Sequence, residues 1–174
     1  NFQPNTTAVL NEVDDTTKII FICSPNNPTG NSISTESINE LIANFDGLVV
    51  IDEAYIDFSN KESWVTKLNE FPNLIVTQTL SKAYGMAGIR LGICIASKEI
   101  ISILNKIKPP YNVNELTQQK ALERVVDAKK INAEVKDILK ERGQLEKVLN
   151  DISFVETVYE SDANFLLAKV DDAN

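Results

Sequence analysis

A lysine stands in a glycine-rich stretch, TLSKAYGMAGIRLG (79–92), that joins two apolar runs of the sequence. Lys82 follows the first run, and Arg90 precedes the second. A lysine in such a place is either a solvated surface residue or an amine held for covalent chemistry with a carbonyl group. The residues around it in the fold have to decide between these two interpretations.

Two other polar groups follow apolar runs in the same way. The run KIIFIC (18–23) leads to Asn27 in SPNNPTG, and the run LVVID (48–52) ends in Asp52. In open α/β sheets, ligands bind outside the carboxyl ends of the strands. We therefore expect neighbouring strands to deliver an amide, a carboxylate and an amine to one crevice.

Each of these groups also has an ordinary explanation. Asn27 could build a tight turn, because Asn, Pro and Gly dominate turns. Asp52 could cap a helix or, at the end of LVVIDEA, serve a magnesium–nucleotide site. A nucleotide site of that kind needs G-x-x-x-x-G-K-[ST], which the sequence lacks. Arg90 could form a structural ion pair, and Tyr55 could belong to the core.

Composition excludes several classes of function. The chain has 174 residues, no histidine and a net charge of −8. Catalysis by Ser-His-Asp or Cys-His is therefore excluded, and we predict no metal site. We expect no nucleic-acid partner, because no basic patch is present, and no membrane partner, because no apolar stretch approaches roughly 18 residues. Cys23 and Cys94 lie in apolar runs and are expected to be buried free thiols of a cytoplasmic protein.

Four apolar runs have the composition of strands. They are rich in β-branched residues and nearly continuous, which is typical of strands buried on both faces. The runs are KIIFIC (18–23), LVVID (48–52), LIVTQTL (74–80) and LGICIAS (91–97). Helix patterns at 34–45, with Ser34 as the expected cap, and at 61–71 separate the first three runs. This order predicts an α/β fold, with a mostly parallel sheet and helices on both faces.

The remaining pattern predicts one reversed strand and a second unit. Only ten residues (81–90) join the third and fourth runs, too few for a parallel crossover, so the fourth strand is expected to be antiparallel. A helix pattern at 98–107 is followed by KPPYN, which is typical of a hinge. Two more helices, the second long and amphipathic, and strands at 154–160 and 164–170 then indicate the start of a small α+β domain.

Three motifs together resemble a known family. SPNNPTG, DEAY and TLSKAYGMAGIRLG, in this order and spacing, are similar to the motifs of fold-type I pyridoxal-phosphate (PLP) aminotransferases. Within that group, KPPYNVN and DANFLL resemble the histidinol-phosphate aminotransferases, and the resemblance runs through essentially the whole chain. It implies PLP as cofactor, histidinol phosphate and 2-oxoglutarate or glutamate as substrates in histidine biosynthesis, and a homodimer.

The resemblance also implies roles for individual residues. Lys82 would be the Schiff-base lysine, which also moves a proton between the substrate Cα and the C4′ atom of the cofactor. Asp52 would pair with the pyridine nitrogen, so that the ring acts as an electron sink. Asn27 and Tyr55 would hydrogen-bond the 3′ oxygen of the ring. Lys82, Asp52 and Tyr55 are therefore the expected catalytic residues.

The cofactor phosphate would be bound at the far end of the same motif. Thr79 and Ser81 would contribute hydroxyl groups, and Arg90 a guanidinium that can grip two phosphate oxygens at once. The family's phosphate loop and ring-stacking aromatic residue normally precede the position of Asn1, and its substrate-binding arginine normally follows Asn174. We therefore expect an internal piece of a longer enzyme that is inactive on its own.

The expected domains and the competing functions follow from the same resemblance. Residues 1–108 would be part of the PLP-binding large domain, 109–112 a hinge, and 113–174 the linking helices and a partial small domain. The alternatives are a threonine-phosphate decarboxylase, an aspartate- or aromatic-type aminotransferase and, from a different class, a non-catalytic ligand-binding domain on the same scaffold. A yellow, borohydride-reducible complex would separate the enzymes from the binding domain.

Overall fold

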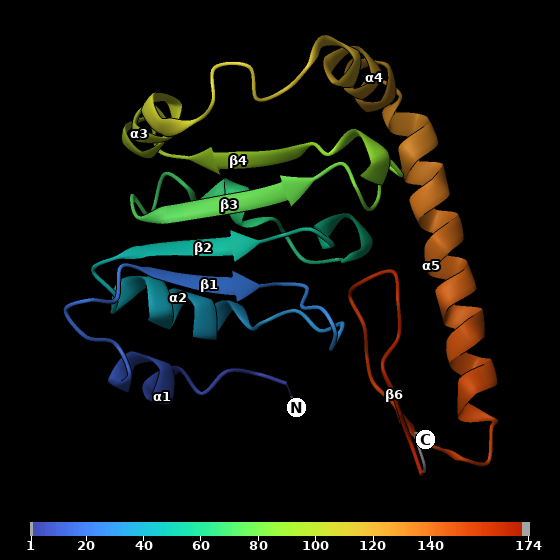
Figure 1. Cartoon of the computed structure of the whole chain (residues 1–174). Helices are drawn as coiled ribbons and strands as arrows, with labels where there is room; N and C mark the ends of the chain where they lie inside the picture. Colours follow the sequence, from blue (N-terminus) through green and yellow to red (C-terminus); the bar gives the residue numbers. More distant parts are fainter. Residues whose placement is uncertain (1, 172–174) are drawn as a thin grey trace.

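The computed structural model describes residues 2–171 and places a four-stranded sheet at the centre of the chain (Figure 1). The strands, in spatial order, are β1 (Ile19–Cys23), β2 (Leu48–Asp52), β3 (Leu74–Thr79) and β4 (Gly92–Ala96). The first three pair in parallel, and β4 runs antiparallel to β3. The predicted α/β fold with a mostly parallel sheet and one reversed strand is confirmed.

One face of the sheet carries the core, under helix α2 (Thr35–Ala43). The helix begins as predicted at Ser34, whose hydroxyl accepts a hydrogen bond from the Ser37 N–H at 3.1 Å. Glu36 in the first turn adds a negative charge at the positive end of the helix dipole. Helix α1 (Thr6–Asn11) packs against the same core through its apolar residues.

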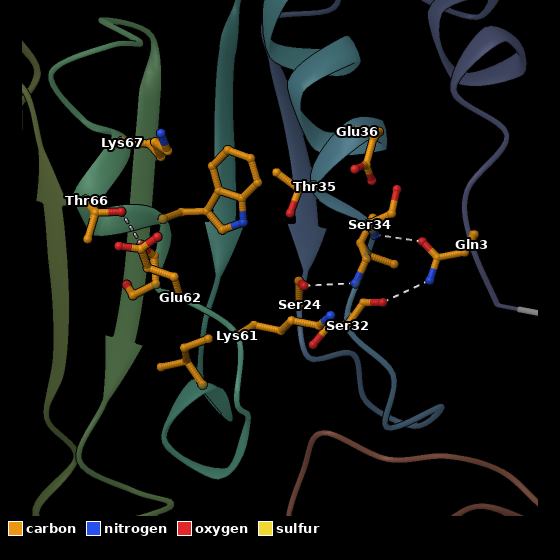
Figure 2. Close-up of a pocket in the computed structure, with 14 residues that line it drawn as sticks. Gln3, Ser24, Ser32, Ser34, Thr35, Glu36, Lys61, Glu62, Thr66 and Lys67 are labelled. Atoms are coloured by element: carbon orange, nitrogen blue, oxygen red, sulfur yellow. Dashed lines mark hydrogen bonds between the residues drawn. The ribbon is translucent and has the colours of Figure 1, made fainter.

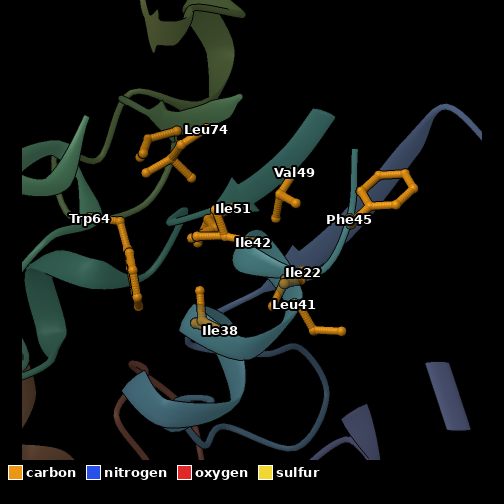
Figure 3. Close-up of a cluster of buried hydrophobic side chains, with 10 residues drawn as sticks. Ile22, Ile38, Leu41, Ile42, Phe45, Val49, Ile51, Trp64 and Leu74 are labelled. Carbon is orange, nitrogen blue, oxygen red and sulfur yellow. The ribbon is translucent and has the colours of Figure 1, made fainter. Parts of the chain in front are cut away.

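The core consists of side chains from α2 and the strand faces that it covers, together with Phe45 and Trp64 from the connecting segments (Figure 3). Burial of each large aliphatic side chain contributes about 1.5–3 kcal/mol, so this layer fixes the positions of the strand ends. Its buried members are Ile22, Ile38, Leu41, Ile42, Phe45, Val49, Ile51, Trp64, Leu74 and Val76.

The opposite face of the sheet is open at both edge strands. Phe21 on β1 is 71% exposed, and Cys23 and Cys94 are exposed as well. The expectation that the strands are buried on both faces is therefore wrong for the edge strands, because within residues 2–171 nothing covers their outer side. The cysteines are free thiols, as predicted, but their predicted burial is wrong.

The predicted helix at 61–71 is also wrong. The structure has only two short 3₁₀ helices between β2 and β3, η1 (Ile56–Phe58) and η2 (Trp64–Lys67). The side chain of Ser63 caps η2 by accepting a hydrogen bond from the Val65 N–H. A helix cannot be prolonged easily toward Pro72, because the residue before a proline is pushed out of the helical region.

Beyond the sheet, the predicted helices and hairpin are present. They are α3 (Lys98–Ile107), α4 (Glu115–Val125), α5 (Ala128–Asn150), β5 (Val155–Val158) and β6 (Ala168–Val170). Figure 1 shows α5 standing on the side to which the arrowheads of β1, β2 and β3 point, with the loop between β5 and β6 on the same side. None of the helices within residues 2–171 is long and apolar enough to cross a bilayer. The division into domains at 109–112 stays a prediction. Residues 1 and 172–174, at the outer ends of the two predicted domains, lie outside the described residues.

Candidate active site

The residues that follow the three parallel strands meet at Tyr55. The Asn27 side-chain amide, after β1, donates a hydrogen bond to the Tyr55 hydroxyl at 3.1 Å. The Lys82 ammonium, after β3, lies 5.0 Å from the centroid of the Tyr55 ring, within the range of a cation–π contact. Tyr55 itself is only 6% exposed. The sheet therefore joins the predicted amide, phenol and amine in one cluster.

Asp52 ends β2 beside this cluster and is oriented by its own neighbours. Its Oδ1 accepts hydrogen bonds from the Thr77 hydroxyl and from the Ala54 N–H, each at 3.2 Å. Because both hydrogen bonds fall on Oδ1, the Oδ2 atom can still accept a hydrogen bond from a bound molecule. Cys23 lies on the neighbouring strand β1. Partial burial of its thiol and the negative charge of Asp52 together raise the pKa of that thiol.

Thr79 and Ser81 form a pair of hydroxyls at the end of β3. Their oxygens lie 2.9 Å apart, and the Thr79 hydroxyl also accepts a hydrogen bond from the Ser81 N–H at 3.0 Å. Arg90 lies at the end of the loop in a left-handed conformation, with φ of 54°. Its guanidinium donates to the Ala87 carbonyl at 3.1 Å and, within residues 2–171, makes no hydrogen bond to either hydroxyl.

Together these groups can hold a small molecule that has a carbonyl, a basic ring nitrogen and an anionic group. The amine of Lys82 can attack a carbonyl, and Asp52 can pair with a protonated nitrogen. The hydroxyl pair and Arg90 provide donors for an anion. Within the described residues, no cluster of His, Cys, Asp and Glu is placed to hold a metal ion.

A comparison with protein families identifies the group of enzymes to which the chain belongs. The family described as "Aminotransferase class I and II" matches residues 1–174. The chain belongs to the aminotransferase class I and II family. The motifs that carry the candidate site, from SPNNPTG to TLSKAYGMAGIRLG, all lie within the matched range.

Relatives within this aminotransferase family cover the chain throughout. A histidinol-phosphate aminotransferase of Flavobacterium johnsoniae is 66% identical over 174 residues, which are 100% of this chain and 50% of that protein. The crystal structure of the histidinol-phosphate aminotransferase of Clostridium acetobutylicum matches with a TM-score of 0.86 and 28% identity, over 95% of this chain and 51% of that one. The chain thus spans about half the length of the curated relatives it matches.

A third match shows the same fold at lower identity. The histidinol-phosphate aminotransferase of Sinorhizobium meliloti, solved in complex with pyridoxal-5'-phosphate, matches with a TM-score of 0.84 and 23% identity. The match covers 96% of this chain and 45% of that one.

Several residues around this candidate site were not predicted. Phe165 packs its ring edge against Tyr55, with the centroids 5.2 Å apart and the planes at 86°. Thr77 bonds Asp52, as described above. The position of Thr77 could have been found from the sequence, because it stands two residues before Thr79 and side chains alternate along a strand. Phe165 lies in the motif DANFLL noted above, but nothing in the sequence indicates its contact with Tyr55, which is distant along the chain.

Glu53, the residue after Asp52, is the most deeply buried charged group that was missed. It is 1% exposed and accepts hydrogen bonds from the Ser63 hydroxyl at 2.6 Å, the Trp64 N–H at 2.6 Å and the Gln78 side-chain amide at 2.9 Å. One carboxylate thereby ties the end of β2 to η2 and to β3. Glu53 holds in place the segment that leads from Asp52 through Tyr55.

Glu53→Ala is expected to lower the free energy of unfolding by about 1–3 kcal/mol, because the buried Trp64 N–H and the Gln78 amide lose their acceptor. Urea denaturation of the chain measures this change. Glu62→Ala, an exposed glutamate of the same segment, is the matched control and should stay within about 0.5 kcal/mol of the unchanged chain. Equal stabilities of the two variants would show that Glu53 does not tie these segments together.

A cavity of about 370 Å³ lies away from the candidate site, between the start of α2 and η2 (Figure 2). Its lining includes Ser24, Ser34 and Lys61. The Ser24 hydroxyl accepts a hydrogen bond from the Ile33 N–H at 2.9 Å, and Gln3 bonds both the Ser32 carbonyl and the Ser34 N–H. These groups hold the start of α2, and the cavity contains none of the predicted site residues.

Proposed function

We propose that this chain carries the cofactor-binding site of a PLP-dependent aminotransferase and that Lys82 binds PLP covalently. The observation that carries the proposal is the position of the Lys82 amine over the ring of Tyr55, whose hydroxyl is bonded by Asn27. Asp52 ends the strand that leads to Tyr55, and within residues 2–171 both of its hydrogen bonds fall on Oδ1. The cofactor requires an amine for its aldehyde and a carboxylate for its ring nitrogen. It also requires an amide–phenol pair for its ring oxygen, and two hydroxyls with a guanidinium for its phosphate.

Each catalytic residue then has a defined role. When bound, PLP supplies an electron-withdrawing ring for the charge that is left on the substrate Cα. Lys82 would hold the cofactor and would also act as the general base that takes the proton from the substrate Cα. Asp52 keeps the proton on the ring nitrogen. Tyr55 and Asn27 bind the ring oxygen, and the ring of Tyr55 orients the Lys82 amine.

The anionic end of the cofactor would be bound by Thr79, Ser81 and Arg90. The two hydroxyl oxygens lie 2.9 Å apart, and the Ser81 N–H donates to the Thr79 hydroxyl, so both groups are close enough to bind the same anion. Arg90 stands at the other end of the same loop, and a guanidinium can bind two phosphate oxygens in parallel. In this assignment the phosphate displaces the Ala87 carbonyl as the acceptor of Arg90.

For the substrates, we propose histidinol phosphate as amino donor and 2-oxoglutarate as acceptor, in histidine biosynthesis. The support is the identity of 66% to the Flavobacterium johnsoniae enzyme over the whole of this chain. We further propose a homodimer, because exposed apolar residues on α3, such as Ile103 and Ile107, would be covered by a second copy. The two free thiols support a reducing compartment, the cytoplasm.

A chimera tests the proposed reaction. Residues 1–174 of this chain replace the matching segment of the Flavobacterium johnsoniae enzyme, which supplies the rest of a full-length protein. We expect the chimera to form glutamate from histidinol phosphate and 2-oxoglutarate, measured in a coupled assay, whereas the 174-residue chain alone forms none. Release of carbon dioxide from threonine phosphate would favour the decarboxylase, and ligand binding without turnover would favour a non-catalytic domain.

A further inference from the structure

The loop that carries Lys82 and Arg90 contains two glycines in open space. An added Cβ at Gly85 or Gly88 would meet no atom within 4 Å, and Gly85 has a φ of 67°. Glycines in open space leave the backbone free to move. Inside the loop, the Gly85 N–H donates to the Lys82 carbonyl at 2.9 Å, which closes a turn beginning at the lysine. The Met86 N–H also donates to the Leu80 carbonyl at 2.9 Å, and Ala83 is 3% exposed. Contacts from α4 add to these and reach the Tyr84 carbonyl of the turn.

One face of α4 supplies these contacts. Thr117, Ala121 and Arg124 follow one another at intervals of four and three residues, and so lie on one side of the helix. The Thr117 hydroxyl donates to the Ile89 carbonyl at 3.4 Å, and the Arg124 Nε donates to the Tyr84 carbonyl at 2.9 Å. Ala121 between them is 7% exposed. The helix therefore holds the loop on both sides of its open glycines.

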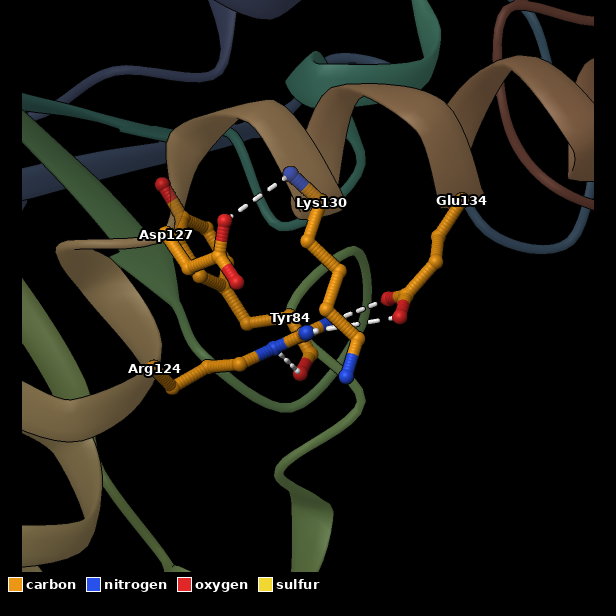
Figure 4. Close-up of polar contacts among 5 residues, drawn as sticks. All are labelled: Tyr84, Arg124, Asp127, Lys130 and Glu134. Atoms are coloured by element: carbon orange, nitrogen blue, oxygen red, sulfur yellow. Dashed lines mark hydrogen bonds and ion pairs between the residues drawn. The ribbon is translucent and has the colours of Figure 1, made fainter.

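The guanidinium of Arg124 is itself oriented by α5. Its two Nη atoms face the carboxylate oxygens of Glu134, as Figure 4 shows, while Nε points to the Tyr84 carbonyl. The hydrogen bond from Arg124 lowers the pKa of the Glu134 carboxyl. A fork of this kind is planar and rigid, and a lysine cannot reproduce it, because its single nitrogen cannot serve both acceptors in the same geometry.

We propose that Arg124, oriented by Glu134, is a positioning residue that sets the turn after Lys82 and so holds the Lys82 amine over Tyr55. The Tyr84 carbonyl lies two residues beyond Lys82, so fixing it fixes the backbone from which the amine extends. The role for the cofactor rests on the proposed function. The effect on the loop can be measured without any cofactor.

Hydrogen–deuterium exchange of the 174-residue chain tests the effect on the loop. Arg124→Lys is expected to speed exchange of the Gly85 and Met86 amides by about tenfold, because the loop loses roughly the stabilisation of one hydrogen bond. The exchange rates of the β2 amides should stay unchanged. Glu134→Gln should act in the same direction but less strongly. Lys120→Gln is the matched control, because it removes an exposed ion pair of α4, with Glu123 at 2.7 Å, without touching the loop.

A spectroscopic measurement on the chimera tests the effect on Lys82. Arg124→Lys should slow the appearance of the visible band of bound PLP by about tenfold at equal cofactor concentration, and Lys120→Gln should leave it unchanged. Unchanged exchange at Gly85 and Met86, or equal acceleration throughout β2, would overturn the proposal. If exchange responds as expected but the unaltered chimera binds no PLP at Lys82, the proposed function fails while the role of Arg124 in the loop stands.

Discussion

Lys82→Ala in the chimera should abolish the visible absorbance of covalently bound PLP and lower turnover by at least about 10²–10⁴-fold. One positioned proton-transfer group contributes a factor in that range. The variant would in addition lose the covalent bond to the cofactor. Within residues 2–171, Lys82 follows β3 at the edge where the three parallel strands end, whereas Lys98 follows the antiparallel β4 at the opposite edge. Lys67 is paired with Glu70 at 2.8 Å on the surface. Absorbance spectra and the coupled assay measure both effects.

Lys61→Ala is the control for Lys82→Ala, because Lys61 is exposed and lines the separate cavity near α2. It should keep the absorbance and the turnover of the unaltered chimera. Circular dichroism should show that both variants are folded. A Lys82→Ala variant that retains the visible band would mean that another amine binds the cofactor.

Asp52→Asn should leave PLP bound but slow removal of the substrate α-proton by about 10²–10³-fold, the usual cost of losing one preorganised electrostatic partner. The asparagine can still accept hydrogen bonds from Thr77 and Ala54, so the end of β2 should keep its structure. It cannot, however, hold a proton on the ring nitrogen. Stopped-flow measurement of the half-reaction with amino donor gives the rate.

Asp57→Asn is the matched control for Asp52→Asn. Asp57 lies in η1, and burial, together with the charge of Glu53, raises the pKa of its carboxyl. It is a nearby carboxyl group that does not stand at a strand end, so its variant should react within a few-fold of the unaltered chimera. Half-reaction rates of Asp52→Asn that are equally close to the unaltered rate would contradict the role given to Asp52.

The sheet could be predicted because its determinants are local. Nearly continuous β-branched runs defined β1 to β4 within one or two residues, and the short connection at 81–90 required β4 to be antiparallel. Polar residues placed directly after such strands must meet at one edge. For this reason Asn27, Asp52 and Lys82 could be grouped from the sequence, whereas Tyr55 was added only by the family resemblance.

What could not be predicted depends on contacts between distant segments. A helical pattern at 61–71 became a single 3₁₀ turn, because Glu53 binds Ser63 and Trp64 and fixes the chain there. Edge strands and central strands have the same composition, so nothing in the sequence indicated that Phe21 would be exposed. Arg124 reads as one more basic residue of a surface helix until its bond to the Tyr84 carbonyl is seen.

Trapping of the cofactor tests the central claim most directly. The chimera is incubated with PLP, reduced with borohydride and digested, and the modified peptide is identified by mass spectrometry. We predict a single modified residue, Lys82, and no modification in the Lys82→Ala variant. Modification of a different lysine, or an unmodified Lys82 at saturating PLP, would contradict the account.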